Sequence, residues 1–393
     1  MAQCWKLSVA GFAATAITYG PARMGFGLFL SDIRADFALS TGMAGLISSL
    51  GFLGMLLGLV AAYAILARVG PRASVLTGLG LATIGTGLVA GAPGLPVLAL
   101  GTVLAMTSAG FAWSPFNNIV SRRLPDGARP SALAIISTGT SLGIAAAGAT
   151  AITVSLTGLP WQAGWAAFAI AGALAGVGNV AALSEPSGPL GASWPREPWA
   201  TLLHRSAMPL YAIAFSFGTT SAIYFSFAAD RIEQSGGLPH VPSGTSPAIL
   251  FLCFGLIGLT GLATGRIKGR IGLSALLRVL LLGSALSLGL MALAPASWSG
   301  VVLSAGLQGA FVMMMSAILA FWSERLFPQM PARSFTAALI AVAAGSVIGP
   351  VTAGVMADVV GAKAMFLTAA ALSATTMPVI LPRLIQERPG PAV

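Results

Sequence analysis

Long apolar stretches recur along the whole chain and alternate with short segments that carry most of its charged residues. Each stretch is close to the roughly 20 residues that an α-helix needs to cross about 30 Å of hydrocarbon. The pattern therefore predicts about twelve membrane-spanning helices joined by short connections. They are expected near residues 7–30, 43–66, 73–92, 96–119, 131–155, 163–183, 207–228, 247–265, 274–293, 299–322, 334–357 and 363–382.

The composition points to the same class of protein. Of the 393 residues, 56% are hydrophobic and only 8% are charged, and the mean hydropathy is +0.90. Ordinary soluble domains carry about 25% charged residues. The chain is therefore predicted to be an all-α, multi-pass integral membrane protein, and an even number of crossings places both termini on one side.

The basic residues set the orientation. Fifteen of the 20 lysines and arginines lie on the side that would hold both termini, three lie on the opposite side, and Arg23 and Arg278 lie within helices. Because basic loops stay in the cytoplasm, both termini are predicted to be cytoplasmic, in what we expect to be a bacterial inner membrane. This distribution explains the net charge of +10. The protein is expected to be surrounded by membrane lipid and to bind no nucleic acid.

The segment "SEPSGPLGASWPREPWATLLHRS" (184–206) is rich in proline, glycine and serine, which is typical of a linker. It predicts an N-terminal six-helix bundle over 1–184, a cytoplasmic linker over 185–206 and a C-terminal six-helix bundle over 207–393. Three residues recur 198 positions later, with Gly20, Phe29 and Asp32 matched by Gly218, Phe227 and Asp230. Two such bundles related by a pseudo-two-fold axis are typical of transporters.

Arg23 is the charge that topology does not explain. It stands nine residues before Asp32, about 14 Å along a helix, which places it near the middle of the membrane. A charge at that depth costs roughly 2.5–3.5 kcal/mol on insertion scales and normally faces a polar cavity. The preceding Gly20-Pro21 pair is expected to interrupt the helix. Snorkelling is the alternative, but the side chain is too short to reach water from the midplane.

No acidic residue is predicted at the depth of Arg23, because five of the ten fall near each membrane face. An unpaired arginine in a cavity is a suitable docking point for an anion, and its guanidinium binds carboxylate or phosphate groups bidentately. The same distribution argues against a carboxylate proton relay in the cavity. A coupling proton, as in symport, is expected to travel with the substrate or to involve Asp32 and Asp230 at the outer mouth.

Two basic segments carry a family resemblance. "YAILARVGPR" (63–72) resembles the cytoplasmic signature G-x-x-x-D-R-x-G-R-R of the major facilitator superfamily, and "GRIKGRIG" (265–272) resembles its second copy. Both copies lack the acidic residue, which is replaced by Ala67 and Gly269. The resemblance implies that Arg68, Arg72 and Arg270 act at an inner gate; the alternative is that they serve only as topology signals. Asp32 and Asp230 are the expected outer gate.

In that family, helices one, four, seven and ten line the central cavity. The resemblance therefore implies that the substrate is bound by residues on these helices around Arg23. The residues themselves show no metal-ligand spacing and no nucleotide loop, so neither a metal nor a cofactor is expected. On this basis the candidate substrate-binding residues are Arg23, Tyr19, Phe26, Trp113, Asn117, Thr220, Ser221, Tyr224, Gln308 and Met314. Helix packing is the alternative role for the polar and sulfur-containing members of this set.

Within the superfamily, "YGPARMGFGLFLSDI" (19–33) resembles the first helix of monocarboxylate-porter-like members, whereas the arginine such members carry in helix eight is lacking here. The sequence is best explained as a secondary active transporter of a small organic anion, acting by alternating access and as a monomer. Multidrug-type export of hydrophobic or cationic compounds is the alternative, and a sensor or scaffold is the third. No catalytic motif indicates an enzyme.

Overall fold

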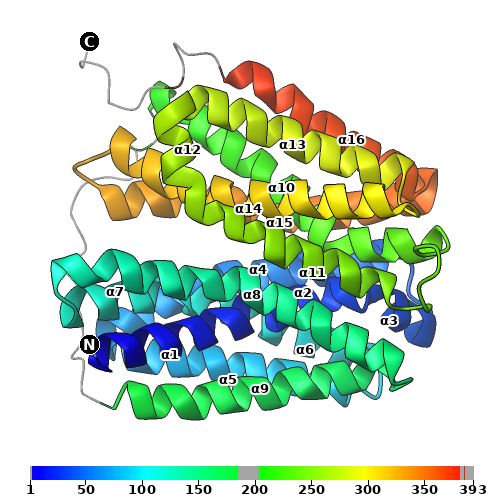
Figure 1. The fold of residues 1–393 in the computed structure, drawn as a ribbon, viewed down its shortest axis with the longest axis horizontal. Coiled ribbons are helices and arrows are strands. Elements are labelled where there is room, and N and C mark those ends of the chain that lie inside the picture. Colours follow the sequence, from blue (N-terminus) through cyan, green and yellow to red (C-terminus); the bar gives the residue numbers. More distant parts are fainter. Residues whose placement is uncertain (1, 185–201, 203, 381–384, 386–393) are drawn as a thin grey trace.

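A computed structural model describes residues 2–184, 202, 204–380 and 385, and within these ranges the chain forms helices and turns but no strand. Figure 1 shows two groups of helices lying against each other, α1–α9 below and α10–α16 above. We call these groups the N-terminal bundle and the C-terminal bundle. The expected linker falls largely on residues outside the described ranges.

The N-terminal bundle begins with three helices in line, of 18, 8 and 8 residues, and continues with six more. Their bounds are α1 Ala2–Tyr19, α2 Pro21–Leu28, α3 Leu30–Phe37, α4 Thr41–Arg68, α5 Pro71–Ala90, α6 Leu95–Thr107, α7 Trp113–Arg123, α8 Arg129–Leu156 and α9 Trp161–Ala182. A short 3-10 segment, Ser108–Phe111, joins α6 to α7.

The C-terminal bundle contains the remaining seven helices. Their bounds are α10 Met208–Gln234, α11 Ser246–Gly258, α12 Thr264–Ile271, α13 Leu273–Leu293, α14 Trp298–Leu326, α15 Pro331–Val360 and α16 Ala362–Thr376. A second 3-10 segment, Leu259–Ala263, joins α11 to α12. Like α6 and α7, these two helices form one long, interrupted rod.

Ten helical rods among the described residues are long and apolar enough to cross a membrane, which establishes a multi-pass membrane protein. The expected runs at 7–30 and 363–382 are not among these ten. The first is divided between α1, α2 and α3, and the second is represented by α16, which has 15 residues. These two runs therefore differ from the other ten because the first is interrupted by helix breaks and the second forms only a short helix.

The breaks around α2 follow from local sequence. Pro21 stands at the first helical position, where its missing N–H costs nothing, and Gly20 before it leaves helical geometry. At the other end, Phe29 departs from helical dihedral angles while its N–H still bonds to Gly25. Arg23 consequently lies on a separate eight-residue helix between two breaks.

Close backbone contacts join the two bundles. α4 packs along α15, α8 packs along α11, and α2 and α3 contact α10. A side chain at Gly27 would collide with the carbonyl oxygen of Phe225, and one at Gly45 would collide with that of Pro350. Small residues at these positions let the helices approach closely, as is usual between membrane helices.

Hydrogen bonds between the bundles gather at one end of the molecule. We call this the Asp230 end, on the right in Figure 1 where α3 lies, and we call the opposite end, where α9 ends and α10 begins, the linker end. At the Asp230 end, the Ser155 hydroxyl donates to the Ser243 carbonyl at 3.0 Å and lies 2.8 Å from the Thr245 hydroxyl. The bundles are thus bonded to each other at this end.

Candidate functional site

The Arg23 guanidinium is surrounded by aromatic rings. Its central carbon lies 5.6 Å from the ring centre of Tyr19, 5.7 Å from that of Phe52 and 5.2 Å from that of Phe225. These rings belong to α1, α4 and α10, so both bundles contribute to the surroundings of one cation. Each such contact stabilises a cation by about 0.5–2 kcal/mol, more when water is excluded.

Arg23 has no anionic partner among the described residues. Its Nε atom is buried and forms no hydrogen bond, and the two ion pairs recorded between described residues involve other arginines. The aromatic faces therefore provide partial compensation for the charge, while the buried Nε–H donor has no recorded acceptor among the described residues.

The other candidate substrate-binding residues divide by exposure. Tyr19, Trp113 and Asn117 are partly exposed. The remaining six are buried, and three of them, Phe26, Tyr224 and Met314, lie in the hydrophobic core. The buried polar members are Thr220, Ser221, Tyr224 and Gln308.

Two of the buried polar residues are bonded within the C-terminal bundle. The Thr220 hydroxyl donates to the Ser216 carbonyl of its own helix at 2.8 Å. The Tyr224 hydroxyl lies 3.2 Å from that of Ser304, which in turn lies 3.0 Å from that of Ser287. Gln308 and Ser221, in contrast, have buried polar atoms without a hydrogen-bond partner.

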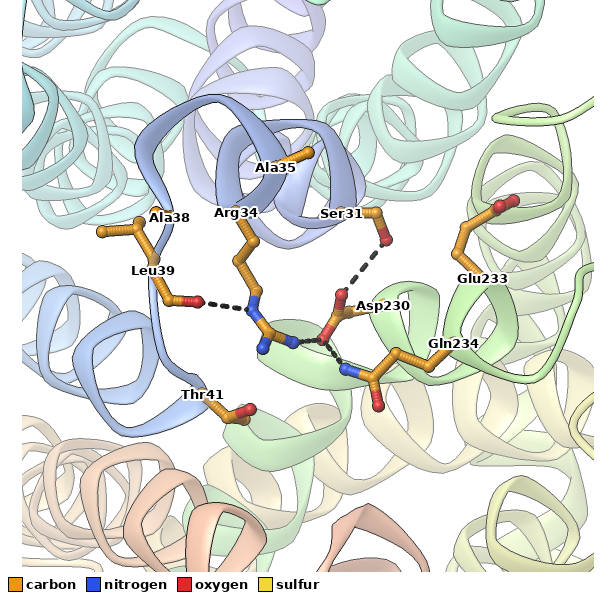
Figure 2. Close-up of a pocket in the computed structure, with 9 residues that line it drawn as sticks. All are labelled: Ser31, Arg34, Ala35, Ala38, Leu39, Thr41, Asp230, Glu233 and Gln234. Atoms are coloured by element: carbon orange, nitrogen blue, oxygen red, sulfur yellow. Dashed lines mark hydrogen bonds and ion pairs between the residues drawn. The ribbon is translucent and has the colours of Figure 1, made fainter.

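A charged cluster joins the bundles at the Asp230 end. Arg34 on α3 donates from Nη1 to the Asp230 carboxylate on α10 at 2.5 Å, and its Nε donates to the Leu39 carbonyl at 3.0 Å. Ser31 and Gln234 donate to the same carboxylate at 3.2 and 2.6 Å. Figure 2 shows these three donors converging on Asp230. Only 4% of Asp230 is exposed, so the pair is largely shielded from water.

The same residues line a pocket with a volume of about 480 Å³, between α3, the 38–41 turn and the end of α10. Arg34 and Asp230 form one of its walls, and the Glu233 side chain in Figure 2 lies to one side of the cluster. Arg23 is not among the pocket residues. The pocket is therefore a feature of the Asp230 end, separate from the Arg23 site.

A second acidic residue joins the bundles at this end. The Asp358 carboxylate at the end of α15 accepts hydrogen bonds from the backbone N–H groups of Thr41 and Gly42, at 2.9 and 2.8 Å. These N–H groups belong to the first turn of α4, where helices lack internal partners and carry partial positive charge. Asp358 therefore acts as a cap supplied by the opposite bundle.

The expected gate residues differ in their surroundings. Asp230 is buried and paired across the bundles, whereas Asp32 is exposed on α3. Arg68 and Arg270 are exposed at the ends of α4 and α12, and Arg72 is partly exposed at the start of α5. Arg34 and Asp358 were absent from the predicted gate, although Arg34 lies only two residues after Asp32.

Among the described residues, no group of three or more histidine, cysteine or acidic side chains could hold a metal ion. Cys4 and Cys253 are free thiols, on α1 and α11.

These features define a class of protein: a multi-pass membrane protein with two groups of helices and an unpaired arginine between them. The family model described as Major Facilitator Superfamily matches residues 11–294. The chain belongs to the major facilitator superfamily, and it is a membrane transporter of that fold. No curated protein matches its sequence.

Solved structures of transporters share the fold. A crystal structure of the nucleoside transporter NupG is 15% identical, with a TM-score of 0.71, covering 97% of this chain and 98% of that one. A bacterial homologue of the human lysosomal transporter Spinster, inward-facing and occupied, is 18% identical, with a TM-score of 0.73 and coverage of 99% and 98%. A POT family transporter in complex with 5-aminolevulinic acid is 15% identical, with a TM-score of 0.76 and coverage of 98% and 96%.

Proposed function

We propose that the chain is a secondary active transporter of small organic anions, carboxylates in the first place, that works by alternating access. The observation that carries the proposal is the environment of Arg23. Its guanidinium is held among three aromatic rings, and no carboxylate among the described residues pairs with it. Within the described part of the chain the Arg23 guanidinium therefore lacks an anionic partner, which an anionic substrate would supply.

Aromatic contact and hydrogen bonding make different demands on a guanidinium. The rings of Tyr19, Phe52 and Phe225 attract its positive charge without using an N–H group, whereas a carboxylate accepts hydrogen bonds from the N–H groups in its plane. An anion can therefore bind to Arg23 while the guanidinium stays between the rings. Trp113 and Asn117 are the other partly exposed candidates for substrate contact. This arrangement supports a substrate with a carboxylate at one end, and 5-aminolevulinic acid, bound by one similar transporter, carries such a group.

The charge of Arg23 also argues against the main alternative. A multidrug-type exporter of cations would bring a second positive charge next to Arg23, at a place where no acid among the described residues compensates it. Like charges at short range in a low dielectric repel strongly. An anionic substrate removes this repulsion and supplies the missing partner at once.

The proposed topology has twelve crossings, with α1–α3 as the first and α16 as the last, and with both termini in the cytoplasm. It divides the chain into halves at 1–184 and 207–393, joined by the segment 185–206. In this topology the Asp230 end faces outward. The recorded bonds between the bundles gather there and, in this topology, support a conformation closed on the outer side.

A coupling proton has two proposed routes in such a transporter. It enters with the substrate as the neutral acid, or it binds at Asp32 and Asp230 at the outer mouth. Asp230 binds Arg34 in the closed conformation, so protonation of its carboxylate would weaken the closure. In this second route, a proton changes the conformation by binding at the closed Asp230 end.

The proposal is tested with purified full-length protein and a panel of small monocarboxylates, dicarboxylates, phosphate esters, nucleosides and cationic dyes. The readout is the shift of the unfolding midpoint that a ligand causes. We expect carboxylates to raise the midpoint of wild type, Arg23→Ala to abolish the shift, and Arg23→Lys to retain part of it. Arg278→Ala is the matched control, because Arg278 donates to the Ile380 carbonyl at the far edge of the C-terminal bundle.

Two results would contradict the proposal in different ways. If wild type responds to dyes or nucleosides and to no anion, the substrate class is wrong. If an anion shifts wild type and Arg23→Ala equally, the substrate class stands and Arg23 is not its anchor. Uptake of the responding compound into proteoliposomes then measures transport directly.

A further inference from the structure

One level inside the C-terminal bundle has several polar atoms without partners. Both the Nε2 and the Oε1 atoms of Gln308 on α14 lack a hydrogen bond, as do the hydroxyls of Ser284 on α13 and Ser221 on α10. Gln308 and Ser284 are fully buried, and Ser221 is 4% exposed. Buried polar groups in proteins are nearly always hydrogen-bonded, so such a group needs an explanation.

The register of α10 against α14 brings two of these residues together. The two helices are antiparallel, and Tyr224 meets Ser304 while the rings of Phe217 and Phe311 lie 5.4 Å apart. Gln308 lies between the two contacts on α14, one turn from Ser304. The corresponding part of α10 is residues 220–221, which includes Ser221.

The register of α13 against α14 adds the third residue. Ser287 and Ser304 bond to each other through their hydroxyls and carbonyls. One turn from this contact toward the linker end, Ser284 follows on α13 and Gln308 on α14, because residues three or four apart share a helix face. Ser221, Ser284 and Gln308 therefore lie at one level of the bundle, which we call the Gln308 level.

Both neighbouring levels are occupied. On one side, the hydroxyls of Tyr224, Ser304 and Ser287 bond to one another. On the other side, the rings of Phe217 and Phe311 pack edge to face. The Gln308 level is thus enclosed between a completed hydrogen-bond network and an aromatic pair.

The chemistry of Gln308 limits what can fill this level. Its Nε2 needs an acceptor and its Oε1 needs a donor. A metal cation cannot accept from Nε2, and a carboxylate cannot donate to Oε1. The charged residues described on α10, α13 and α14 lie near the ends of these helices, so a charged occupant would have no counter-charge at this level.

We propose that the Gln308 level is a binding site for one or two water molecules, held by Gln308, Ser284 and Ser221. Water donates and accepts, carries no charge and typically makes about three hydrogen bonds at buried sites. Ser221 occupies the position in the second repeat that Arg23 occupies in the first. The two bundles accordingly differ at this position, with a cation in the first and a neutral, hydrated site in the second.

This site has a mechanical consequence for α10. A direct side-chain bond between α10 and α14 would have to break if the helices shift, whereas a bridging water exchanges partners at little cost. α10 also carries Phe225, which contacts Arg23, and Asp230, which binds Arg34. The water site therefore includes a residue, Ser221, of the helix that bears two of the contacts between the bundles.

The first test is the sign of a stability change in purified full-length protein. Gln308→Leu replaces the amide by an apolar side chain of similar size. If water bridges the amide to the serines, the variant strands those hydroxyls, and the unfolding midpoint falls by about 2–4 °C. If the amide has no partner in the folded protein, the substitution removes a buried unpaired group, the midpoint rises, and the proposal fails. Met315→Leu, an apolar exchange at a fully buried position two turns along α14, is the matched control and should change the midpoint little.

Two further measurements identify the occupant. Ser284→Ala combined with Gln308→Leu should cost less than the two single changes together, since both act through one water; additive losses would overturn the shared site. Replacing choline by Na⁺ at constant ionic strength should leave the midpoint unchanged. A rise with Na⁺ in wild type that Gln308→Leu abolishes would assign the level to a cation and overturn the proposal.

A density map of the wild type decides the matter without any variant. We expect a peak within hydrogen-bond distance of Gln308 Nε2 and the Ser284 hydroxyl in a map that resolves other buried waters. An empty level in such a map would overturn the proposal, whatever the variants show.

Discussion

The ion pair between Arg34 and Asp230 is expected to hold the two bundles together at the Asp230 end, and its contribution can be measured with a substitution. Arg34→Met keeps an unbranched apolar side chain at this position and removes the guanidinium with its charge. The Asp230 carboxylate would then remain buried, with Ser31 and Gln234 as its recorded hydrogen-bond donors. We expect the conformation that is closed at this end to lose stability against conformations in which Asp230 can reach water.

The size of the loss follows from burial. Removing one partner of a buried ion pair costs about 3–5 kcal/mol, because the other charge is left uncompensated. The Arg34 side chain is 22% exposed, and two neutral donors stay in place, so partial solvation reduces the expected cost to about 2–3 kcal/mol. This shifts the equilibrium between conformations by about 30- to 150-fold.

The shift is measured with spin labels on Leu159 and Pro239, which are exposed residues of different bundles near the Asp230 end. Pulsed electron resonance gives the distribution of distances between the labels. Arg34→Met should move population from short to long distances, and Asp230→Asn added to it should restore part of the short population. Arg129→Met is the matched control, because Arg129 pairs with Asp126 inside the N-terminal bundle. A distribution unchanged by Arg34→Met would refute the assignment of this pair as a closure.

Three further predictions concern contacts between the bundles. Asp358→Asn weakens the cap on α4, and we expect a loss of about 0.5–2 kcal/mol in the closed conformation, measured with the same labels. Phe225→Leu removes a ring that the opposite bundle contributes to Arg23, so it should shift the distances as well as ligand affinity. Phe52→Leu, within the N-terminal bundle, should change affinity alone; equal effects of both on the distances would contradict this division. Gly27→Ala collides with the Phe225 carbonyl and should open the Asp230 end, whereas Gly80→Ala, which meets no neighbour, should leave the distances unchanged.

The sequence predicts features that depend on local chemistry. The Gly20-Pro21 pair indicated a helix break beside Arg23, and the structure begins α2 at Pro21. Helix length and hydropathy predicted a multi-pass membrane protein, which ten described rods bear out. These features follow from a few adjacent residues and from the thickness of a bilayer, so no knowledge of tertiary contacts is needed.

Partners across helices are a different matter, because they depend on register and rotation. Arg34 is one of the three basic residues that the sequence predicts on the side opposite the termini, and nothing in the sequence places it against Asp230, 196 positions later. The internal repeat equates Asp32 with Asp230, yet one is exposed and the other is buried and paired. Phe225 is one among many apolar residues of its helix until the fold brings it to Arg23. The repeat predicts equivalent positions, but it does not predict equivalent surroundings.

The difference between the repeats is itself what a carrier of one anion needs. If both bundles placed a cation at the level of Arg23, two unpaired charges would face each other in a low dielectric, at a cost that grows as their separation falls. The C-terminal bundle has Ser221 at that position. The residue by which this bundle contacts Arg23 is Phe225, through its ring. A ring stabilises a guanidinium without neutralising it, so the site stays cationic when empty and still joins the two bundles. An anion that binds Arg23 thus meets a charge provided by the N-terminal bundle, next to a ring provided by the C-terminal bundle. Because the site includes both bundles, binding can favour one arrangement of the bundles over another and so bias the equilibrium between conformations.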